Sequence, residues 1–275
     1  MRISFKTLCK VLACLVACSA YSIDTNAQDY WQQELKYSIK VKLDDKKHAL
    51  DAYETIEYIN NSPDELTYIY MHLWPNAYKD RSTALVKQKL ENGEKNLYYA
   101  SEERRGYIDG LDFKVDGEKV KWELDPEHID ICKLTLNKPL KSGGRIIIST
   151  PFHLKFPRGV YSRLGHIGES YQVTQWYPKP AVYDKNGWHQ MPYLDQGEFY
   201  SEYGTYDVFI TLPQNYMVGA TGDLIGGDQE RNWLEMKVEE TKEYLKNSEG
   251  LARNTRAVGI DELTFPPSSA DIKTL

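Results

Sequence analysis

The sequence lacks the short motifs that mark a self-sufficient catalytic centre. Its six histidines never stand four residues apart, so no helix can place two imidazoles on one face in the spacing that binds a metal. It has no Gly-x-Ser-x-Gly turn for a serine nucleophile and no glycine-rich loop that would cradle phosphate. No nucleophile, base and oxyanion donor can be grouped from the chain, so we expect no catalytic residue and no cofactor in it.

Cysteine is equally scarce. Three of the four cysteines lie within the first 18 residues, and Cys132 is the fourth. Once the leader described below is removed, Cys132 has no cysteine to pair with. A disulfide framework is therefore excluded, and so is a multi-cysteine zinc site.

The chain also lacks an excess of positive charge. Its formal net charge is −6, and removing residues 1–27, with Arg2, Lys6, Lys10 and Asp24, subtracts a net +2 and leaves −8. A surface of that sign repels a phosphate backbone and anionic lipid. Nucleic acid is therefore excluded as a partner.

The only marked apolar run is Val11–Ala20, which is too short to span a bilayer. It follows a basic stretch and precedes Thr25-Asn26-Ala27, so residues 1–27 are predicted to be a signal peptide. Leu15-Val16-Ala17-Cys18 also resembles a bacterial lipobox, in which Cys18 would carry a lipid anchor. We prefer simple secretion to the periplasm or the cell exterior, with an outer-membrane lipoprotein as the alternative.

Residues 28–225 alternate apolar and polar side chains with period two, as half-buried strands require. Turn residues such as those at Asn60–Pro63 separate the alternating segments. The pattern predicts a mainly antiparallel β fold, a sandwich or saddle. It also predicts a hairpin-like pair between Tyr206–Leu212 and Tyr216–Ala220.

Two helices are predicted. Ser82–Glu91 has partial helical spacing, a residue that could cap its start in Ser82, and Asn92-Gly93 at its end. Glu230–Lys246 has only a thin apolar stripe, so this helix should lie on the surface. We assign residues 226–275 as a helix and a connection toward a further domain, because the last four residues begin to alternate again.

Thr174–Tyr193 is the stretch around which the chain is organised. It holds two tryptophans, three tyrosines and three prolines. Gln175-Trp176-Tyr177 should end a strand, because Pro178 and Pro180 cannot donate to a β ladder. Such a rigid aromatic segment suits the wall of a ligand pocket, whereas the plainer interpretation makes the tryptophans core residues.

This stretch and the segment GEFYSEYGTYDVFITLPQNYMVGATG together resemble the N-terminal domain of bacterial zinc aminopeptidases of the aminopeptidase N family, a group of gluzincin metallopeptidases. The likeness covers roughly residues 29–222 and is greatest to the secreted branch. It implies a saddle-shaped β-sandwich that packs on a separate catalytic domain and contributes a loop to the peptide-binding pocket. The zinc is expected in that catalytic domain, whose binding motif this sequence lacks.

The resemblance also implies which residues face the substrate. The family's loop often reads Thr-Gln-x-Glu, and Thr174 and Gln175 match it, so Gln175 would line the pocket beside Trp176 and Tyr177. Tyr177 stands in place of the glutamate. A phenol, with a reference pKa of about 10, carries no full negative charge at neutral pH, so strict recognition of a substrate amine is not implied.

Two functions therefore compete. The first is a non-catalytic portion of a secreted zinc metallopeptidase that binds peptide together with a catalytic domain. The alternative is a free-standing cell-envelope β-domain that binds peptide or carbohydrate through its aromatic side chains. The first is preferred, because the chain ends within an apparent strand.

Overall fold

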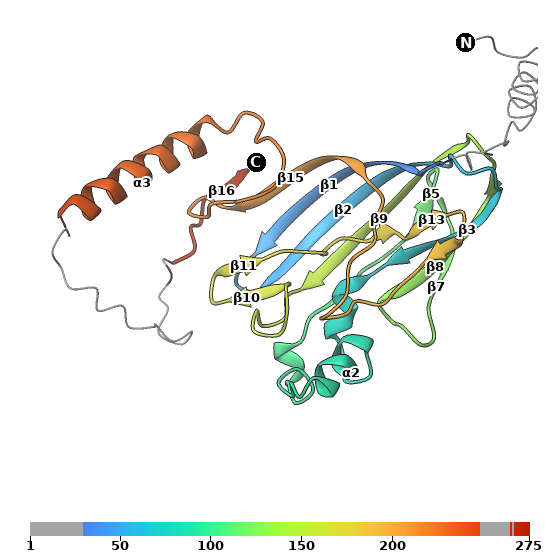
Figure 1. Ribbon diagram of the computed structural model, residues 1–275. Coiled ribbons are helices and arrows are strands. Elements are labelled where there is room, and N and C mark those ends of the chain that lie inside the picture. The colour runs from blue at the N-terminus through green and yellow to red at the C-terminus, as the bar shows by residue number, and fades with distance from the viewer. Residues whose placement is uncertain (1–29, 248–264, 266) are drawn as a thin grey trace, which may run out of the picture. The chain divides into compact units, whose positions relative to one another are not determined.

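The computed structural model describes residues 30–247, 265 and 267–275 (Figure 1). The predicted signal peptide and Cys18 lie outside the described residues. Residues 32–275 cluster as one unit. No described helix is long and apolar enough to cross a membrane.

The larger sheet is built from long alternating strands (Figure 1). Its strands, in sheet order, are β16 (Ile272–Thr274), β15 (Gly204–Pro213), β1 (Glu34–Asp44), β2 (Ala49–Ile59), β9 (Arg145–Lys155), β5 (Lys114–Val115) and β6 (Glu118–Lys119), and β4 (Tyr107–Asp109) also pairs with β9. The alternation of β1 buries Leu35, Tyr37 and Ile39, as the sequence pattern predicts.

One pairing in this sheet was not predicted. β15 runs parallel to β1, with Tyr206 opposite Tyr37 in the register. The predicted hairpin between Tyr206–Leu212 and Tyr216–Ala220 is wrong, since residues 216–220 form no strand and β15 pairs with β1 and β16. The β1–β2 hairpin leaves one edge of β1 open, and β15 satisfies its hydrogen-bonding groups. Local alternation cannot reveal so distant a partner.

The smaller sheet has the order β12 (Lys179–Pro180), β3 (Leu66–His72), β8 (Ile131–Leu140) and β7 (Lys121–Leu124). Pro180 therefore lies in a strand, contrary to prediction, because β12 is an edge strand where a missing N–H is tolerated. Gln175, Trp176 and Tyr177 do not end a strand; they lie between β11 and β12 outside regular structure.

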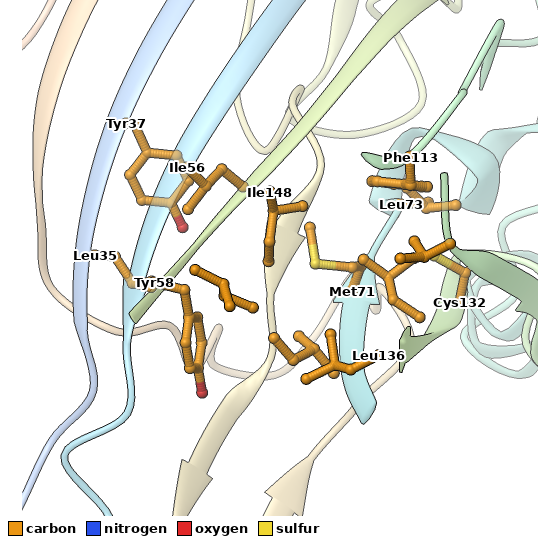
Figure 2. Close-up of a cluster of buried hydrophobic side chains, with 14 of the residues drawn as sticks. Leu35, Tyr37, Ile56, Tyr58, Met71, Leu73, Phe113, Cys132, Leu136 and Ile148 are labelled. Carbon is orange, nitrogen blue, oxygen red and sulfur yellow. The ribbon is translucent and has the colours of Figure 1, made fainter. Parts of the chain in front are cut away.

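The two sheets enclose the main core (Figure 2). Figure 2 shows Tyr37, Ile56 and Ile148 of the larger sheet on one side and Met71 and Cys132 of the smaller sheet on the other. All five are at most 3% exposed. The predicted mainly β sandwich is confirmed.

Short elements close the sandwich. They are η1 (Trp74–Tyr78), α2 (Ala84–Glu91), η2 (Glu102–Arg104) and the hairpins β10 (Gly165–Ile167) with β11 (Ser170–Gln172) and β13 (Val182–Asp184) with β14 (Gly187–His189). The first predicted helix is confirmed as α2, although its N-cap is Thr83, which accepts a hydrogen bond from the N–H of Val86, and not Ser82.

The second predicted helix is confirmed as α3 (Asp228–Asn247), and its apolar side chains are exposed. Glu230 at its start forms an ion pair with Lys273 of β16 at 2.7 Å. The predicted boundary near residue 225, between the β-domain and a connecting segment, stays a prediction.

Candidate functional site

The loop between β11 and β12 carries all three residues predicted to face a substrate. Gln175, Trp176 and Tyr177 are each half-buried. The hydroxyl of Thr174 donates to the carbonyl oxygen of Arg163 at 2.7 Å, which fixes the start of the loop. The predicted residues therefore share one short segment, close to the surface and anchored at one end.

Gln175 has a backbone conformation that few residues adopt. Its φ is 53°, in the left-handed region that is costly for a residue with a Cβ. The Gln175 side-chain carbonyl accepts a hydrogen bond from the ammonium of Lys179, the first residue of β12. Side-chain anchoring thus compensates for an unfavourable backbone, an arrangement that is concentrated at functional sites.

Lys179 is itself buried, with 5% exposure. Its Nζ lies 4.1 Å from the centroid of the Trp74 ring, which stabilises the ammonium through a cation–π contact. Burial nevertheless lowers the pKa of Lys179 to about 7. Sequence analysis missed this residue, since nothing in the pattern indicates that the lysine between two prolines points inward.

Tyr177 joins a cluster of three tyrosines. Its hydroxyl donates to the hydroxyl of Tyr206 at 3.2 Å, and its ring meets that of Tyr37 edge-on at 5.6 Å. Burial and the hydrogen bond with Tyr206 raise the pKa of Tyr177, so its phenol stays neutral. Tyr177 therefore cannot replace the charge of the glutamate that the family pattern has at this position.

Trp176 packs between the two hydrophobic clusters of the domain and contacts both. Its ring centroid lies 6.0 Å from that of Phe152 on β9 and 5.4 Å from that of Tyr177. Trp176 as a whole is only half-buried. Both interpretations of this tryptophan, core residue and pocket wall, fit the geometry.

A carboxyl group lies inside the same region. Glu54 of β2 is fully buried, and neither of its oxygens has a hydrogen-bond partner among the described residues. Burial holds its pKa well above the usual range. When Glu54 is ionised, its negative charge helps to raise the pKa of both Tyr37 and Tyr177. An alternation count could have found Glu54, which shares the inward face of its strand with Ile56 and Tyr58.

The aromatic residues of Thr174–Tyr193 do not form one exposed patch. Tyr193 is 1% exposed, and its hydroxyl accepts a hydrogen bond from Tyr78 at 3.1 Å. Trp188, on β14, packs against Tyr68 and Tyr70 of the smaller sheet instead. Trp176, Tyr177 and Trp188 are each half-buried, and Tyr193 belongs to the core.

No group of three or more histidine, cysteine or acidic side chains that could hold a metal ion occurs among the described residues. His166 stacks on His48 at 3.7 Å, while His189 lies 2.8 Å from Asp184.

Comparison of the sequence with protein-family models and with curated proteins gives no match. The fold resembles solved M1 zinc metallopeptidases. A two-domain M1 zinc metallopeptidase bound to L-arginine shares 12% identity and a TM-score of 0.35, covering 71% of this chain and 37% of that one. The M1 zinc metallopeptidase from Deinococcus radiodurans shares 11% identity, with the same TM-score and the same coverage.

A further structure of the Deinococcus radiodurans enzyme contains a Tyr-Ser-Ala substrate, at the same identity, TM-score and coverage. This chain spans only 37% of the length of these enzymes. A likeness at this identity and TM-score establishes neither a family nor an activity.

Proposed function

We propose that this chain is the N-terminal, non-catalytic β-domain of a secreted zinc metallopeptidase of the aminopeptidase type. It would bind peptide substrate jointly with a catalytic domain that carries the zinc. The observation that carries this proposal is the conformation of Gln175, the residue that matches the family's pocket-lining position. Its backbone has a costly left-handed conformation, and a side-chain hydrogen bond from Lys179 anchors the residue. Such strained and anchored residues are concentrated at functional sites.

The chemistry of the loop suits recognition. The Gln175 amide has both donors and an acceptor, so it can bind the main chain or a polar side chain of a peptide. Trp176 and Tyr177 provide flat apolar surface with little conformational entropy to lose. The loop offers no negative charge to a substrate amine. Tyr177 is a neutral phenol, and the carboxyl group of Glu54 is buried with a raised pKa. The loop would therefore select a substrate side chain and would not hold a charged amine.

Reconstitution tests the proposal. The purified chain alone should hydrolyse no aminoacyl-4-nitroanilide, whereas mixing it with an M1-type catalytic domain should restore hydrolysis. In the restored enzyme, Gln175→Ala should raise KM roughly tenfold, because it removes hydrogen bonds to the substrate and leaves the zinc chemistry in place. Lys87→Gln, an exposed change on α2, serves as the control.

Two results would count against this function. Peptide hydrolysis by the chain alone would mean that it carries its own active site. A stable monomer that retains a peptide or saccharide without any catalytic domain, and loses it on Trp176→Ala, would favour the free-standing binding module.

Export is part of the proposal and has its own test. Mass spectrometry of the protein isolated from its native cell should give Gln28 as the first residue. An acylated Cys18 at the N-terminus would instead establish the lipoprotein alternative.

A further inference from the structure

β15 is the last long strand at its border of the larger sheet, and β16 covers only one end of it (Figure 1). Residues 211–213 of β15 pair with β16, and Ile210 exchanges two backbone hydrogen bonds with Leu275, both at 2.9 Å. Residues 204–209 pair with β1 on one side, and no described strand pairs with them on the other. β15 therefore has an open edge along residues 204–209.

Backbone groups of alternate residues point toward this open edge. In a strand the N–H and C=O of one residue point to the same side, and those of the next residue point to the opposite side. Because the backbone of Ile210 bonds to Leu275, Tyr206 and Val208 also direct their backbone groups toward the open edge, whereas Asp207 directs its groups toward β1. The edge thus presents the donors and acceptors that a further strand needs.

The strands at the other borders of the two sheets are protected against such pairing. β6 consists of two charged residues, β12 is a two-residue strand that contains a proline, and β7 has a lysine and a glutamate among its four residues. Short strands, charges and proline are features with which proteins prevent an edge from pairing. The open edge of β15 is longer, and Tyr206, Val208 and Phe209 are exposed on it. Such an edge is a template for another strand.

The side chains beside the open edge define what an added strand must carry. Tyr206 and Val208 lie opposite Tyr37 and Ile39 in the register, so they extend the apolar face of β1. Asp207 is exposed on the other face of β15. Directly opposite residues on neighbouring strands contact each other on one face. A matching strand therefore has apolar residues opposite Tyr206 and Val208 and a basic residue opposite Asp207.

We propose that residues 204–209 bind an extended, basic and apolar segment of another polypeptide as an added strand. This strand would run antiparallel to β15, in line with β16, which already runs antiparallel along the same edge. In this mode of recognition the main-chain hydrogen bonds provide affinity, and alternate side chains provide specificity. The binding requires neither the Gln175 loop nor a catalytic domain.

A second copy of the chain is a poorer occupant of this edge. Self-pairing over residues 204–209 gives a contact about 20 Å long and about 10 Å high, or roughly 200 Å² per partner. A stable protein–protein interface buries about 800 Å² per partner. Two copies that each have a net charge of −6 also repel each other. A basic segment is attracted by the same charge, and the main-chain ladder supplies its affinity.

Fluorescence anisotropy of a labelled peptide, titrated with the full chain, tests the site. The probe is acetyl-Thr-Val-Lys-Val-Thr-Lys-amide with fluorescein on its last lysine. In antiparallel pairing its two valines lie opposite Val208 and Tyr206, and its first lysine lies opposite Asp207. Saturable binding is expected.

Two N-methylated forms of the peptide distinguish a strand from mere charge attraction. Methylation of both valines removes the N–H groups that face β15, so it should weaken binding roughly tenfold or more. Methylation of both threonines removes N–H groups that point away from β15, so the Kd should stay within about twofold. The two forms have the same charge and the same side chains.

Variants and amide hydrogen exchange locate the binding. Val208→Pro removes an N–H at the open edge, where proline is tolerated, and should weaken binding roughly tenfold in a protein whose thermal transition shows that it folds. Val208→Thr keeps the N–H and the branched shape and should stay within about threefold. In the unchanged protein, the peptide should slow exchange of the Tyr206 and Val208 amides, whereas the Asp207 amide, bonded to β1, is protected with or without it.

Three results would overturn the proposal. The first is the absence of saturable binding. The second is equal binding of the valine-methylated and threonine-methylated peptides. The third is a dimer of the chain, measured by sedimentation, that dissociates on Val208→Pro, since a second copy would then occupy the edge.

Discussion

The ammonium of Lys179 donates a hydrogen bond to the side-chain carbonyl of Gln175, the residue whose φ is 53°. The two residues are four apart, and the first strand residue of β12 thereby fixes the loop that precedes it. Pro178 and Pro180 on either side of Lys179 restrict its backbone. The position of Gln175 consequently depends on one buried cation and on the edge strand that carries it.

Replacing Gln175 separates backbone strain from side-chain bonding. Gln175→Ala and Gln175→Gly both remove the hydrogen bond to Lys179, but only alanine keeps a Cβ in the left-handed region. The glycine variant should therefore be more stable than the alanine variant by about 1 kcal/mol. Urea denaturation of the two proteins measures the difference. Equal stability would show that this backbone conformation is not costly.

Lys179 should make stability rise with pH. Its pKa is about 7 in the folded protein and near its ordinary value of 10.5 in the unfolded chain. Between these values the unfolded chain binds more protons, so the free energy of unfolding increases as pH rises from 7 toward 10.5. Each pKa unit corresponds to about 1.4 kcal/mol. The cation–π contact with the Trp74 ring offsets part of the cost of burying the ammonium, so we expect the free energy of unfolding to gain on the order of 2 kcal/mol by pH 9.

Lys179→Met should abolish this gain, and urea titrations at pH 7, 8 and 9 compare it with the parent. Lys133→Met is the matched control, because Lys133 also lies over an aromatic ring, that of Tyr68 at 4.0 Å, but its side chain is on β8 and half-exposed. An identical slope in the Lys179→Met protein would contradict the assignment.

The sequence predicted the class of fold because the alternation of strands such as β1 and β9 depends only on which face is buried. It did not predict that β15 pairs with β1, since that pairing joins residues far apart in the chain. The tyrosine cluster follows from this register, which places Tyr206 opposite Tyr37. Their rings stack at 4.5 Å, a contact that no local pattern specifies.

The candidate site was predictable in part. Gln175, Trp176 and Tyr177 could be named from a motif, and the structure places all three in one loop. The burial of Tyr193 was not predictable, because its surroundings come from Trp74, Tyr78 and Phe199 on other segments. An aromatic residue looks the same in a sequence whether it lines a pocket or fills a core.

Glu54 should destabilise the domain at alkaline pH. Its pKa is raised above the usual value of 4.5, so the folded state holds its proton more firmly than the unfolded chain. The stability contributed by this proton is therefore lost as pH rises above 4.5 toward the folded pKa. Glu54→Met replaces an unpaired buried carboxyl with an apolar side chain of similar length and should stabilise the protein at pH 8 by about 1–3 kcal/mol.

The matched control for Glu54 is Glu57→Gln on the same strand, where the side chain pairs with Lys36 and Arg145 at the surface. Such exposed pairs contribute little, so the change should stay within about 0.5 kcal/mol. Loss of stability in the Glu54→Met variant would indicate that Glu54 has a partner, such as an ordered water.

The purified chain should contain no stoichiometric zinc. Its histidines do not have metal-ligand spacing, and Cys132 is a single thiol whose pKa is raised by burial. Elemental analysis of protein prepared without chelator measures this directly. One tightly held zinc per chain would require a site assembled from distant residues, and His166→Phe and His189→Phe would then locate it.

His166 should make the domain lose stability in mild acid. Its ring stacks on His48 at 3.7 Å, with Lys155 and Arg158 nearby, and burial is the main cause that lowers its pKa to about 4. In the unfolded chain the pKa returns to about 6.5, so the unfolded state binds more protons between pH 6.5 and 4. The stability present above pH 6.5 is lost as pH falls, by about 1–2 kcal/mol at pH 5.

His166→Phe keeps the stacked ring without the titrating group and should flatten the curve of stability against pH. The control is His153→Gln, on the outward face of β9 beside Asp51, which should leave the curve unchanged. Urea titrations at half-unit steps from pH 7.5 to 4.5 test this, and a His166→Phe curve parallel to the parent's would show that another group senses the acid.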